Sequence, residues 1–509
     1  MTHGDEKSDP AIVAVKLANK SGQPDAELVE PRAGAKGNTT EHGMRRTPGR
    51  TGMSHALDRV RQAAKDKGVK FTALLHHVDA ELLRSAYGWL RKEASPGVDG
   101  VTWTAYGEGL EAKLTDLHDR IHRGAYRARP SRRVYIPKPD GRERPLGIAA
   151  LEDKIVQRAL VEVLNAIWEE DFLGFSYGFR TGRGQHDALD ALAAGIGQRK
   201  VNWILDADIA GFFDAVSHDW LIRFVEHRVG DRRVIRLVRK WLKAGVAEDG
   251  QVTPGTVGTP QGAVISPLLA NIYLHYVFDL WANQWRQRHA QGDVIVVRYA
   301  DDIVAGFEHQ ADAERFLTDM RARLAAFALT LHPGKTRLIE FGRHAAKNRT
   351  ARGLGKPETF GFLGFTHICG RTRRGGFQLR RKSRSDRVRA RLQAIKEELR
   401  RRMHETVDAQ GAWLRRIAMG FNAYYAVPTN SAALWDFRFN VTGLWRRALL
   451  ARSQKAKMTW QRMDVLRDRW LPEPRITHPW PDKRFAVKHP GWEPYAGIPP
   501  VRICAGGAW

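Results

Sequence analysis

Apolar residues recur along the chain at the spacings of helices and of strands. In residues 54–67 and 79–93 they recur every three or four positions, as in amphipathic helices, and Asp79 stands where a helix cap would. Residues 132–148 contain two β-favouring runs around Pro-Asp-Gly, which predicts a hairpin, and a helical pattern returns over residues 151–169.

The middle of the chain contains two short apolar runs interrupted by acidic residues, over residues 201–213 and 294–307. We predict strands there, with helices between and after them. Strands and helices mixed in this way indicate the α+β class with an antiparallel sheet. After residue 370 the pattern becomes almost wholly helical, with helices expected at residues 383–403, 410–425 and 432–451.

These patterns divide the chain into five expected segments. Residues 1–50 are rich in Gly, Lys, Glu, Pro and Thr without apolar periodicity, which predicts a disordered leader. The other four are a helical region over 51–130, an α+β body over 131–370, a helical domain over 371–470, and a Pro- and Trp-rich tail over 471–509. The most apolar stretch, residues 263–281, is interrupted by polar residues, so no membrane span is expected. No charged, then apolar, then small-residue leader opens the sequence, so no signal peptide is expected.

Charge narrows the possible partners. The 83 Lys and Arg residues exceed the 56 Asp and Glu residues, giving a net charge of +27, which predicts a polyanionic partner such as nucleic acid. Residues 371–509 contain 30 basic and 11 acidic residues, so +19 of the +27 lies in this last quarter of the chain. Only two cysteines occur, Cys369 and Cys504, which excludes a disulfide framework or a Cys-rich zinc site and suits a reducing cytosol.

Acidic residues at the ends of the two central strands carry the candidate chemistry. Residues 299–302 read Tyr-Ala-Asp-Asp between β-favouring runs, which places adjacent carboxylates at a hairpin tip. Such carboxylates repel each other unless a cation lies between them, and Mg²⁺ is the natural partner. The other strand ends near Asp206 and Asp208, so two strands could hold two metal ions that activate a 3′-hydroxyl and stabilise pyrophosphate. Asp206 and Asp208 would share a face, and their spacing does not choose between them.

Six motifs in order resemble the conserved blocks of the reverse transcriptase family: residues 132–148, 208–213, 259–274, 299–302, 332–336 and 360–365. The resemblance selects Asp208 over Asp206. It implies that Asp208, Asp301 and Asp302 are catalytic and bind two Mg²⁺ ions, and that Lys335 protonates the pyrophosphate. It further implies nucleotide-binding roles for Lys138, Arg144, Phe213, Gln261 and Gly262, and a primer grip at Phe362, Leu363 and Gly364.

Two of these roles also have a direct physical reason. A triphosphate suits one point charge and one bidentate fork, which Lys138 and Arg144 would supply. A bulky Phe213 beneath the incoming sugar would clash with a 2′-hydroxyl and favour dNTPs over rNTPs. The alternative is that Phe213 is a buried core residue, but its bulk favours DNA synthesis.

Further stretches, at residues 95–102, 136–148, 175–189 and 420–434, are similar to the proteins encoded by bacterial group II introns, and the likeness covers residues 55–505. It implies a right-hand polymerase, with fingers and palm followed by a helical thumb or maturase domain. Such a protein binds its intron RNA, assists splicing and copies the RNA into DNA from dNTPs on a DNA primer at the target. The sequence departs from fuller members because it has no Cys-pair and His nuclease module, so it would not cut the second DNA strand itself.

Two other functions stay open at this point. The chain could be an RNA-binding splicing factor for which polymerisation matters little, although its intact catalytic motifs argue against that. It could also be a reverse transcriptase recruited to antiviral defence or CRISPR adaptation, which a neighbouring intron RNA in the genome would argue against.

Overall fold

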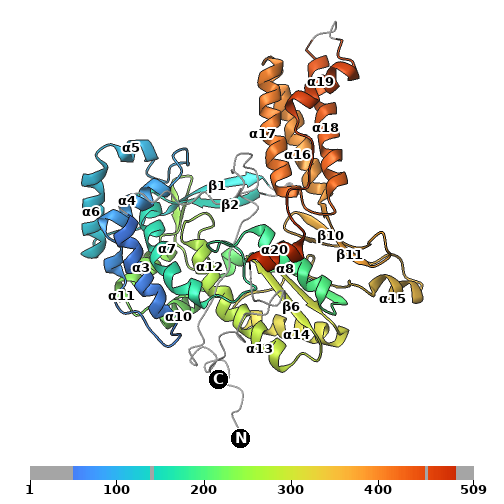
Figure 1. The fold of residues 1–509 in the computed structure, drawn as a ribbon. Helices are drawn as coiled ribbons and strands as arrows, with labels where there is room; N and C mark the ends of the chain where they lie inside the picture. The colour runs from blue at the N-terminus through green and yellow to red at the C-terminus, as the bar shows by residue number, and fades with distance from the viewer. Residues whose placement is uncertain (1–49, 138–142, 453–456, 489–509) are drawn as a thin grey trace.

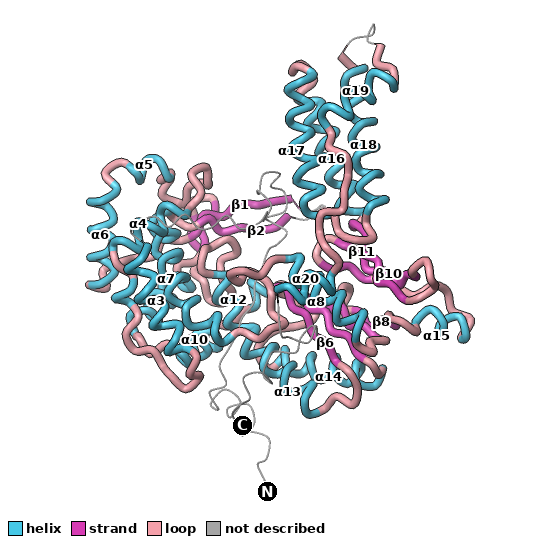
Figure 2. Tube along the Cα trace, in the orientation of Figure 1, coloured by secondary structure: helices cyan, strands magenta, loops and turns pink. Residues whose placement is uncertain are grey.

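The computed structural model describes residues 50–137, 143–452 and 457–488. In this part of the chain, a helical block stands beside a sheet-containing centre, and a column of long helices rises above them (Figure 1; Figure 2). Most of the predicted leader, the hairpin tip with Lys138, and the end of the predicted tail lie outside the described residues. None of the described helices is long and apolar enough to cross a membrane.

The helical block forms because apolar stripes on its helices pack around the long helix α7. The helix N-cap predicted at Asp79 is confirmed, since the Asp79 side chain accepts a hydrogen bond from Leu82 N. The helices of this block are α3 (Arg50–Ala64), η1 (Leu75–His77), α4 (Ala80–Trp89), α5 (Trp103–Gly107), α6 (Leu110–His122), α7 (Leu151–Asp171), α10 (His218–Arg228) and α11 (Arg232–Lys243).

A small sheet projects from this block with the strand order β2-β1-β4-β5. Its strands are β1 (Ser131–Pro137), β2 (Glu143–Ile148), β4 (Val246–Glu248) and β5 (Gln251–Thr253). The predicted hairpin is confirmed, because β1 and β2 pair antiparallel from Arg132 opposite Ile148 to Pro137 opposite Glu143.

The central sheet has the strand order β6-β7-β3-β8, with every pair antiparallel, which confirms the predicted α+β class. Its strands are β3 (Trp203–Asp208), β6 (Val294–Tyr299), β7 (Asp302–Phe307) and β8 (Arg337–Glu340). Because successive side chains alternate between faces, one face packs on α8 and the other on the remaining helices of this layer. These helices are α8 (Gln185–Gln198), α9 (Phe212–Ala215), α12 (Ser266–Leu274), the π-helical turn η2 (His275–Asp279), α13 (Leu280–Arg288) and α14 (Gln310–Ala325).

A third sheet, of order β11-β10-β9, lies between the central sheet and the helical column. Its strands are β9 (Phe360–Phe362), β10 (Phe365–Arg371) and β11 (Phe377–Ser383), and the helix α15 (Ala345–Ala351) precedes them in the chain. The expectation of an almost wholly helical chain after residue 370 is therefore wrong for β11. This strand is rich in Arg and Lys and has little apolar alternation, so its pairing with β10 defines it rather than its own pattern.

The column contains the three expected helices, α16 (Ser385–Arg401), α17 (Val407–Tyr425) and α18 (Ser431–Leu450), and a further helix, α19 (Trp460–Trp470). Its core includes the fully buried Trp445 and a stacked Phe421–Phe437 pair whose ring centroids are 3.7 Å apart. Part of the predicted tail then folds as α20 (Pro481–Lys488), which packs on α8. Arg484 makes ion pairs there with Asp187 at 3.3 Å and Asp190 at 3.4 Å.

Candidate active site

The candidate carboxylates meet where strands β3 and β7 lie side by side. Asp208, the last residue of β3, pairs directly with Asp302, the first residue of β7. Asp302 also pairs with Tyr299 across the β6–β7 hairpin, leaving Ala300 and Asp301 as its two-residue turn. Directly opposite residues of an antiparallel pair share a face, so the structure brings Asp208 and Asp302 together as the motifs predicted.

The turn itself is strained at Ala300, which has φ 66°. A non-glycine residue with this left-handed conformation costs about 1–2 kcal/mol. The first central position of a tight hairpin turn requires positive φ when the turn follows the twist of its strands. Strain of this kind persists only where surrounding contacts hold it, and it recurs at functional sites.

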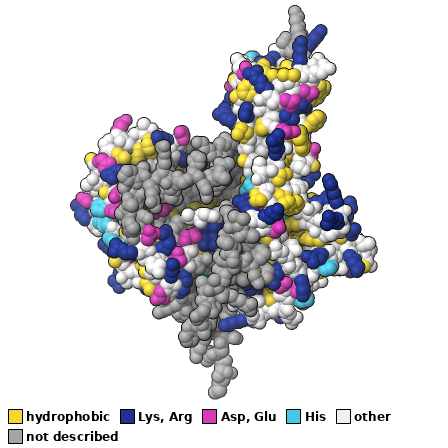
Figure 3. Space-filling view, in the orientation of Figure 1, with side chains coloured by type: hydrophobic (Ala, Val, Ile, Leu, Met, Phe, Trp, Pro, Cys, Tyr) yellow, Lys and Arg dark blue, Asp and Glu magenta, His cyan; other side chains and the backbone are white. Residues whose placement is uncertain are grey.

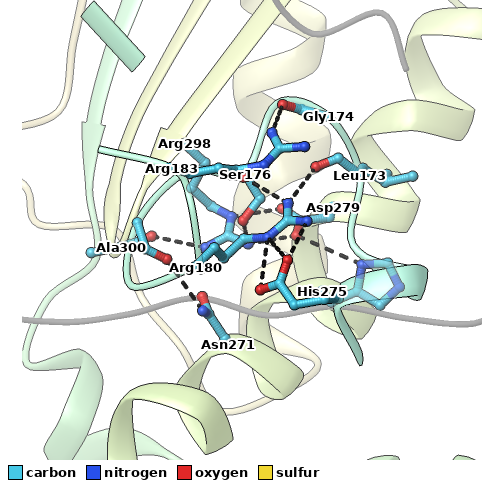
Figure 4. Close-up of polar contacts among 12 residues, drawn as sticks. Leu173, Gly174, Ser176, Arg180, Arg183, Asn271, His275, Asp279, Arg298 and Ala300 are labelled. Atoms are coloured by element: carbon cyan, nitrogen blue, oxygen red, sulfur yellow. Dashed lines mark hydrogen bonds and ion pairs between the residues drawn. The ribbon is translucent and has the colours of Figure 1, made fainter. Parts of the chain in front are cut away.

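Beneath the turn lies a buried polar network that the motif comparison did not anticipate (Figure 4). Arg298 is fully buried, donates to Asp279 Oδ1 at 2.6 Å and to Ser176 Oγ at 2.7 Å, and donates to the Ala300 carbonyl at 3.1 Å. The sequence carried one signal of it, because an Arg inside an otherwise apolar strand needs a buried acidic partner.

Lys335 lies against the carboxylate pair. Its ammonium donates to Asp208 Oδ2 at 2.8 Å, and the turn that carries it is fixed by a 2.7 Å hydrogen bond from His332 N to the Asp208 carbonyl. Partial burial lowers the pKa of Lys335, but the hydrogen bond to Asp208 and the charges of Asp208, Asp302 and Asp301 outweigh burial and raise it. Lys335 therefore stays protonated beside the carboxylates.

Asp206 has a different environment from Asp208, two positions away on the same strand. Its nearest cation is Arg337, at 3.8 Å, on the neighbouring strand β8. Burial raises the pKa of Asp206 to about 6, and the charge of Arg337 only partly opposes this. Asp206 lies two residues further from the hairpin turn, opposite Val304 rather than Asp302, and this register favours Asp208 as the partner of the Tyr-Ala-Asp-Asp motif.

The carboxylates suit Mg²⁺ by ligand type, although they are not preassembled around an ion. In the described parts of the chain, no three His, Cys, Asp or Glu side chains converge as a ready metal site. Mg²⁺ does not need such a cage, because it binds through one or two carboxylates and takes water and substrate phosphates for the rest. Asp208 and Asp302, with the adjacent Asp301, are the residues that fit it.

The predicted nucleotide-binding residues lie on connected segments. The Gln261 carbonyl accepts a 2.6 Å hydrogen bond from Gly147 N on β2, the strand that carries Arg144. Gly262 has φ 106°, and a Cβ there would lie 2.9 Å from the Gly147 carbonyl oxygen, so glycine allows this close approach. The β1–β2 hairpin and the Gln261 turn are thereby joined, while Lys138 lies outside the described residues.

The backbone of Phe213 is hydrogen-bonded to the segment that leads to the Gln261 turn, but its side chain lies largely in the core. Its side chain is 6% exposed and packs edge-on against Phe212, with ring centroids 5.3 Å apart. Its carbonyl accepts a 2.8 Å hydrogen bond from Thr259 N, in the segment that leads to Gln261. Its role in sugar choice stays a prediction.

The predicted primer grip forms a tight hairpin between β9 and β10. Leu363 and Gly364 both have positive φ, 46° and 77°, as both central residues of a type I′ turn do. The Leu363 carbonyl accepts a 2.9 Å hydrogen bond from the Tyr424 hydroxyl of α17, and the Gly364 carbonyl accepts one of 3.0 Å from Arg384 N. Phe362 is buried beside the turn, so the hairpin joins the central sheet to the helical column.

His367, in strand β10 of the same hairpin, is expected to make the stability of the protein depend on pH. His367 is fully buried and stacked on Phe360, and burial, aided by the charge of Arg381, lowers its pKa to about 3. Between pH 6.5 and about 3 the unfolded chain binds a proton that the folded protein does not. Stability from this group should therefore fall with falling pH, by up to about 1.4 kcal/mol per pH unit.

Urea unfolding of the wild type and His367→Leu between pH 4.5 and 7 measures this effect. We expect a shallower loss of stability on acidification in the variant, whatever its stability at pH 7. The exposed His404 provides the control, since His404→Asn should keep the wild-type slope. Equal slopes for His367→Leu and the wild type would contradict the prediction.

Comparison with known proteins places the site within a recognised domain. Residues 136–367 match the family profile described as reverse transcriptase (RNA-dependent DNA polymerase). Protein YkfC of Escherichia coli K12 is 38% identical over 255 residues, which are 43% of this chain and 66% of that protein. Group II intron-encoded protein LtrA of Lactococcus lactis is 39% identical over 166 residues, covering 32% of this chain and 27% of LtrA.

A more distant similarity reaches nuclear intron maturase 4, mitochondrial, of Arabidopsis thaliana, at 26% identity over 42% of this chain and 26% of that protein. The chain spans less than two thirds of the length of these relatives. The carboxylate pair lies within the segment that matches the reverse transcriptase profile. Residues 136–367 thus form a reverse transcriptase domain, and the chain is similar to proteins that group II introns encode.

Proposed function

We propose that this chain polymerises DNA on an RNA template and that the template is a group II intron RNA, copied from a primer at a DNA target. The observation that carries the proposal is the pairing of Asp208 with Asp302, with Lys335 hydrogen-bonded to Asp208. This arrangement lies within the segment that matches the reverse transcriptase profile.

In this proposal the carboxylates of Asp208, Asp301 and Asp302 hold two Mg²⁺ ions, which supply the activation of the 3′-hydroxyl and the stabilisation of the leaving oxygen. Lys335 remains protonated beside Asp208 and donates a proton to the departing pyrophosphate. Arg144, with Lys138, holds the triphosphate. The Gln261–Gly262 turn positions the template and the incoming nucleotide.

The helical column and the β10–β11 hairpin supply the nucleic-acid surface in this proposal. Lys and Arg side chains are spread over both in the space-filling view (Figure 3). Charges on this surface would contact phosphates, so binding should weaken steeply with added salt. We assign the intron RNA to this surface and propose that its binding also assists splicing. The intron-related names of the relatives favour an intron setting over antiviral defence or CRISPR adaptation.

Primer extension tests the proposal and the role of Phe213 together. The wild type should extend a DNA primer on an RNA template with dNTPs and Mg²⁺, and should discriminate against rNTPs. Phe213→Val should lower the ratio of dNTP to rNTP kcat/KM by about 10-fold or more, because a smaller side chain relieves the clash with a 2′-hydroxyl.

Phe212→Val is the matched control. It removes the same volume from the neighbouring, 2% exposed ring and should leave sugar discrimination near the wild-type ratio. No extension by folded wild-type protein would contradict the polymerase proposal. Unchanged discrimination in Phe213→Val would assign that ring to the core alone.

A further inference from the structure

The guanidinium of Arg298 connects two distant parts of the chain, at Asp279 and Ser176, to the Ala300–Asp301 turn. It donates to both carboxylate oxygens of Asp279, to Ser176 Oγ at 2.7 Å and to the Ala300 carbonyl at 3.1 Å. Both members of the Arg298–Asp279 pair are fully buried. A buried guanidinium whose hydrogen bonds are directed at fixed partners is a rigid support.

The position of Arg298 in the hairpin decides what this support can control. Tyr299 pairs with Asp302 and Arg298 pairs with Ile303, so the Arg298 side chain lies on the opposite face from Asp302. Arg298 therefore does not belong to the carboxylate face. It reaches the turn through the Ala300 carbonyl, which belongs to the peptide unit that joins Ala300 to Asp301.

The partners of Arg298 are themselves fixed. Asp279 ends the π-helical turn η2, a rare helix form that is often found at functional sites. Ser176 pairs with Arg298 in an isolated parallel β-bridge. In this bridge Arg298 N donates to the Phe175 carbonyl, and Tyr177 N donates to the Arg298 carbonyl. The buried Arg180 in turn donates to the Ser176 carbonyl at 2.8 Å (Figure 4).

We propose that Arg298 is a positioning residue that orients the Ala300–Asp301 peptide and so sets the direction of the Asp301 and Asp302 carboxylates. Ala300 has a strained φ of 66°. When this hydrogen bond is lost, the turn is therefore free to relax into a less strained backbone conformation. Arg298 acts through the turn and touches no substrate. This inference rests on the proposed polymerase function.

The test removes the contact to the turn without leaving a buried charge unpaired. The double variant Arg298→Met/Asp279→Leu replaces the ion pair by apolar side chains, which buried pairs often tolerate. The control is Arg228→Met/Asp171→Leu, which removes another fully buried pair, 3.1 Å apart, between α10 and α7. Arg298→Lys keeps a cation opposite Asp279 but lacks the fork, and it serves if the double variant does not fold.

Three measurements are made on each folded variant: kcat and KM for dNTP in primer extension, the Mg²⁺ concentration for half-maximal rate, and Mn²⁺ binding without substrate by electron paramagnetic resonance. We expect Arg298→Met/Asp279→Leu, and Arg298→Lys to a smaller degree, to lower kcat at least 10-fold with KM changed less than 3-fold. Both should need more Mg²⁺ and bind Mn²⁺ more weakly, while the Arg228 control keeps the wild-type values.

An active wild type with an equally active Arg298→Met/Asp279→Leu or Arg298→Lys variant would overturn the inference. A loss of kcat equal in the Arg298 and Arg228 variants would also overturn it, because it would show a general effect of losing a buried pair. A wild type that does not extend the primer would instead contradict the proposed function. In that case weaker Mn²⁺ binding confined to the Arg298 variants would still support the positioning role.

Discussion

Asp208→Asn is expected to lower the kcat of primer extension about 10³-fold, the loss that follows from removing several kcal/mol of metal-assisted stabilisation of the transition state. The substitution takes a negative charge from the carboxylate that faces Asp302 and holds Lys335. Steady-state kinetics with saturating dNTP at pH 8 measures it, and thermal melting checks that the variant is folded.

Asp206→Asn is the matched control, since it makes the same change two positions away on the same strand. Asp206 faces Arg337 and is opposite Val304 rather than Asp302, so we expect its kcat to stay within a few-fold of the wild type. A large loss in Asp206→Asn with little loss in Asp208→Asn would show that the assignment of the metal-binding carboxylate is wrong.

Gly262→Ala is expected to lower kcat/KM for dNTP about 10²-fold, because small displacements of positioning groups have effects of this size. A Cβ at this position would lie 2.9 Å from the Gly147 carbonyl oxygen, and the backbone has φ 106°. The segment must move, which separates the Gln261 turn from the β2 strand that carries Arg144. Single-turnover incorporation across a range of dNTP concentrations separates the effect on nucleotide binding from that on the chemical step.

Gly353→Ala controls for the conformational cost alone. Gly353 also has positive φ, 67°, but a Cβ there would meet no atom within 4 Å. This variant should lose some stability and keep the wild-type kcat/KM. Similar losses of kcat/KM in both variants would contradict a specific role for the junction at Gly262.

The sequence was sufficient to predict the Tyr-Ala-Asp-Asp hairpin because the cause of that hairpin is local. Two β-favouring runs around Ala300 and Asp301 define a hairpin, and the acidic residues at its ends are visible in the chain. The spacing alone did not choose between Asp206 and Asp208, and the family resemblance selected Asp208. The structure adds the strand register, which depends on how β3 aligns with β7 and places Asp208 opposite Asp302. Register of this kind is set by tertiary packing as well as by the turn.

The network beneath the turn could not be predicted in the same way. Arg298 finds Asp279 19 positions earlier and Ser176 122 positions earlier in the sequence. No local pattern specifies which acid a buried arginine will meet. The same holds for the Leu363–Gly364 turn, whose motif was recognised but whose contact with Tyr424 spans 61 positions.

Strand β11 illustrates a further limit. Its Arg381 is buried because it pairs with Asp190 of α8 at 2.9 Å, so a basic residue fills an interior position that a pattern of apolar residues would not indicate. The sequence predicts that the basic residues after position 370 form an exposed binding surface. Most of those that the structure describes are exposed, but Arg381 is buried and joins β11 to α8.

The return of α20 to α8 has a mechanical consequence for the helical column. The chain enters the column after β11, which contacts α8, and leaves it through the segment whose Arg484 pairs with Asp187 and Asp190 on that helix. We therefore expect the column to tilt about the line through these two attachments more readily than it twists. Rotation about its long axis would strain one of the two contacts with α8.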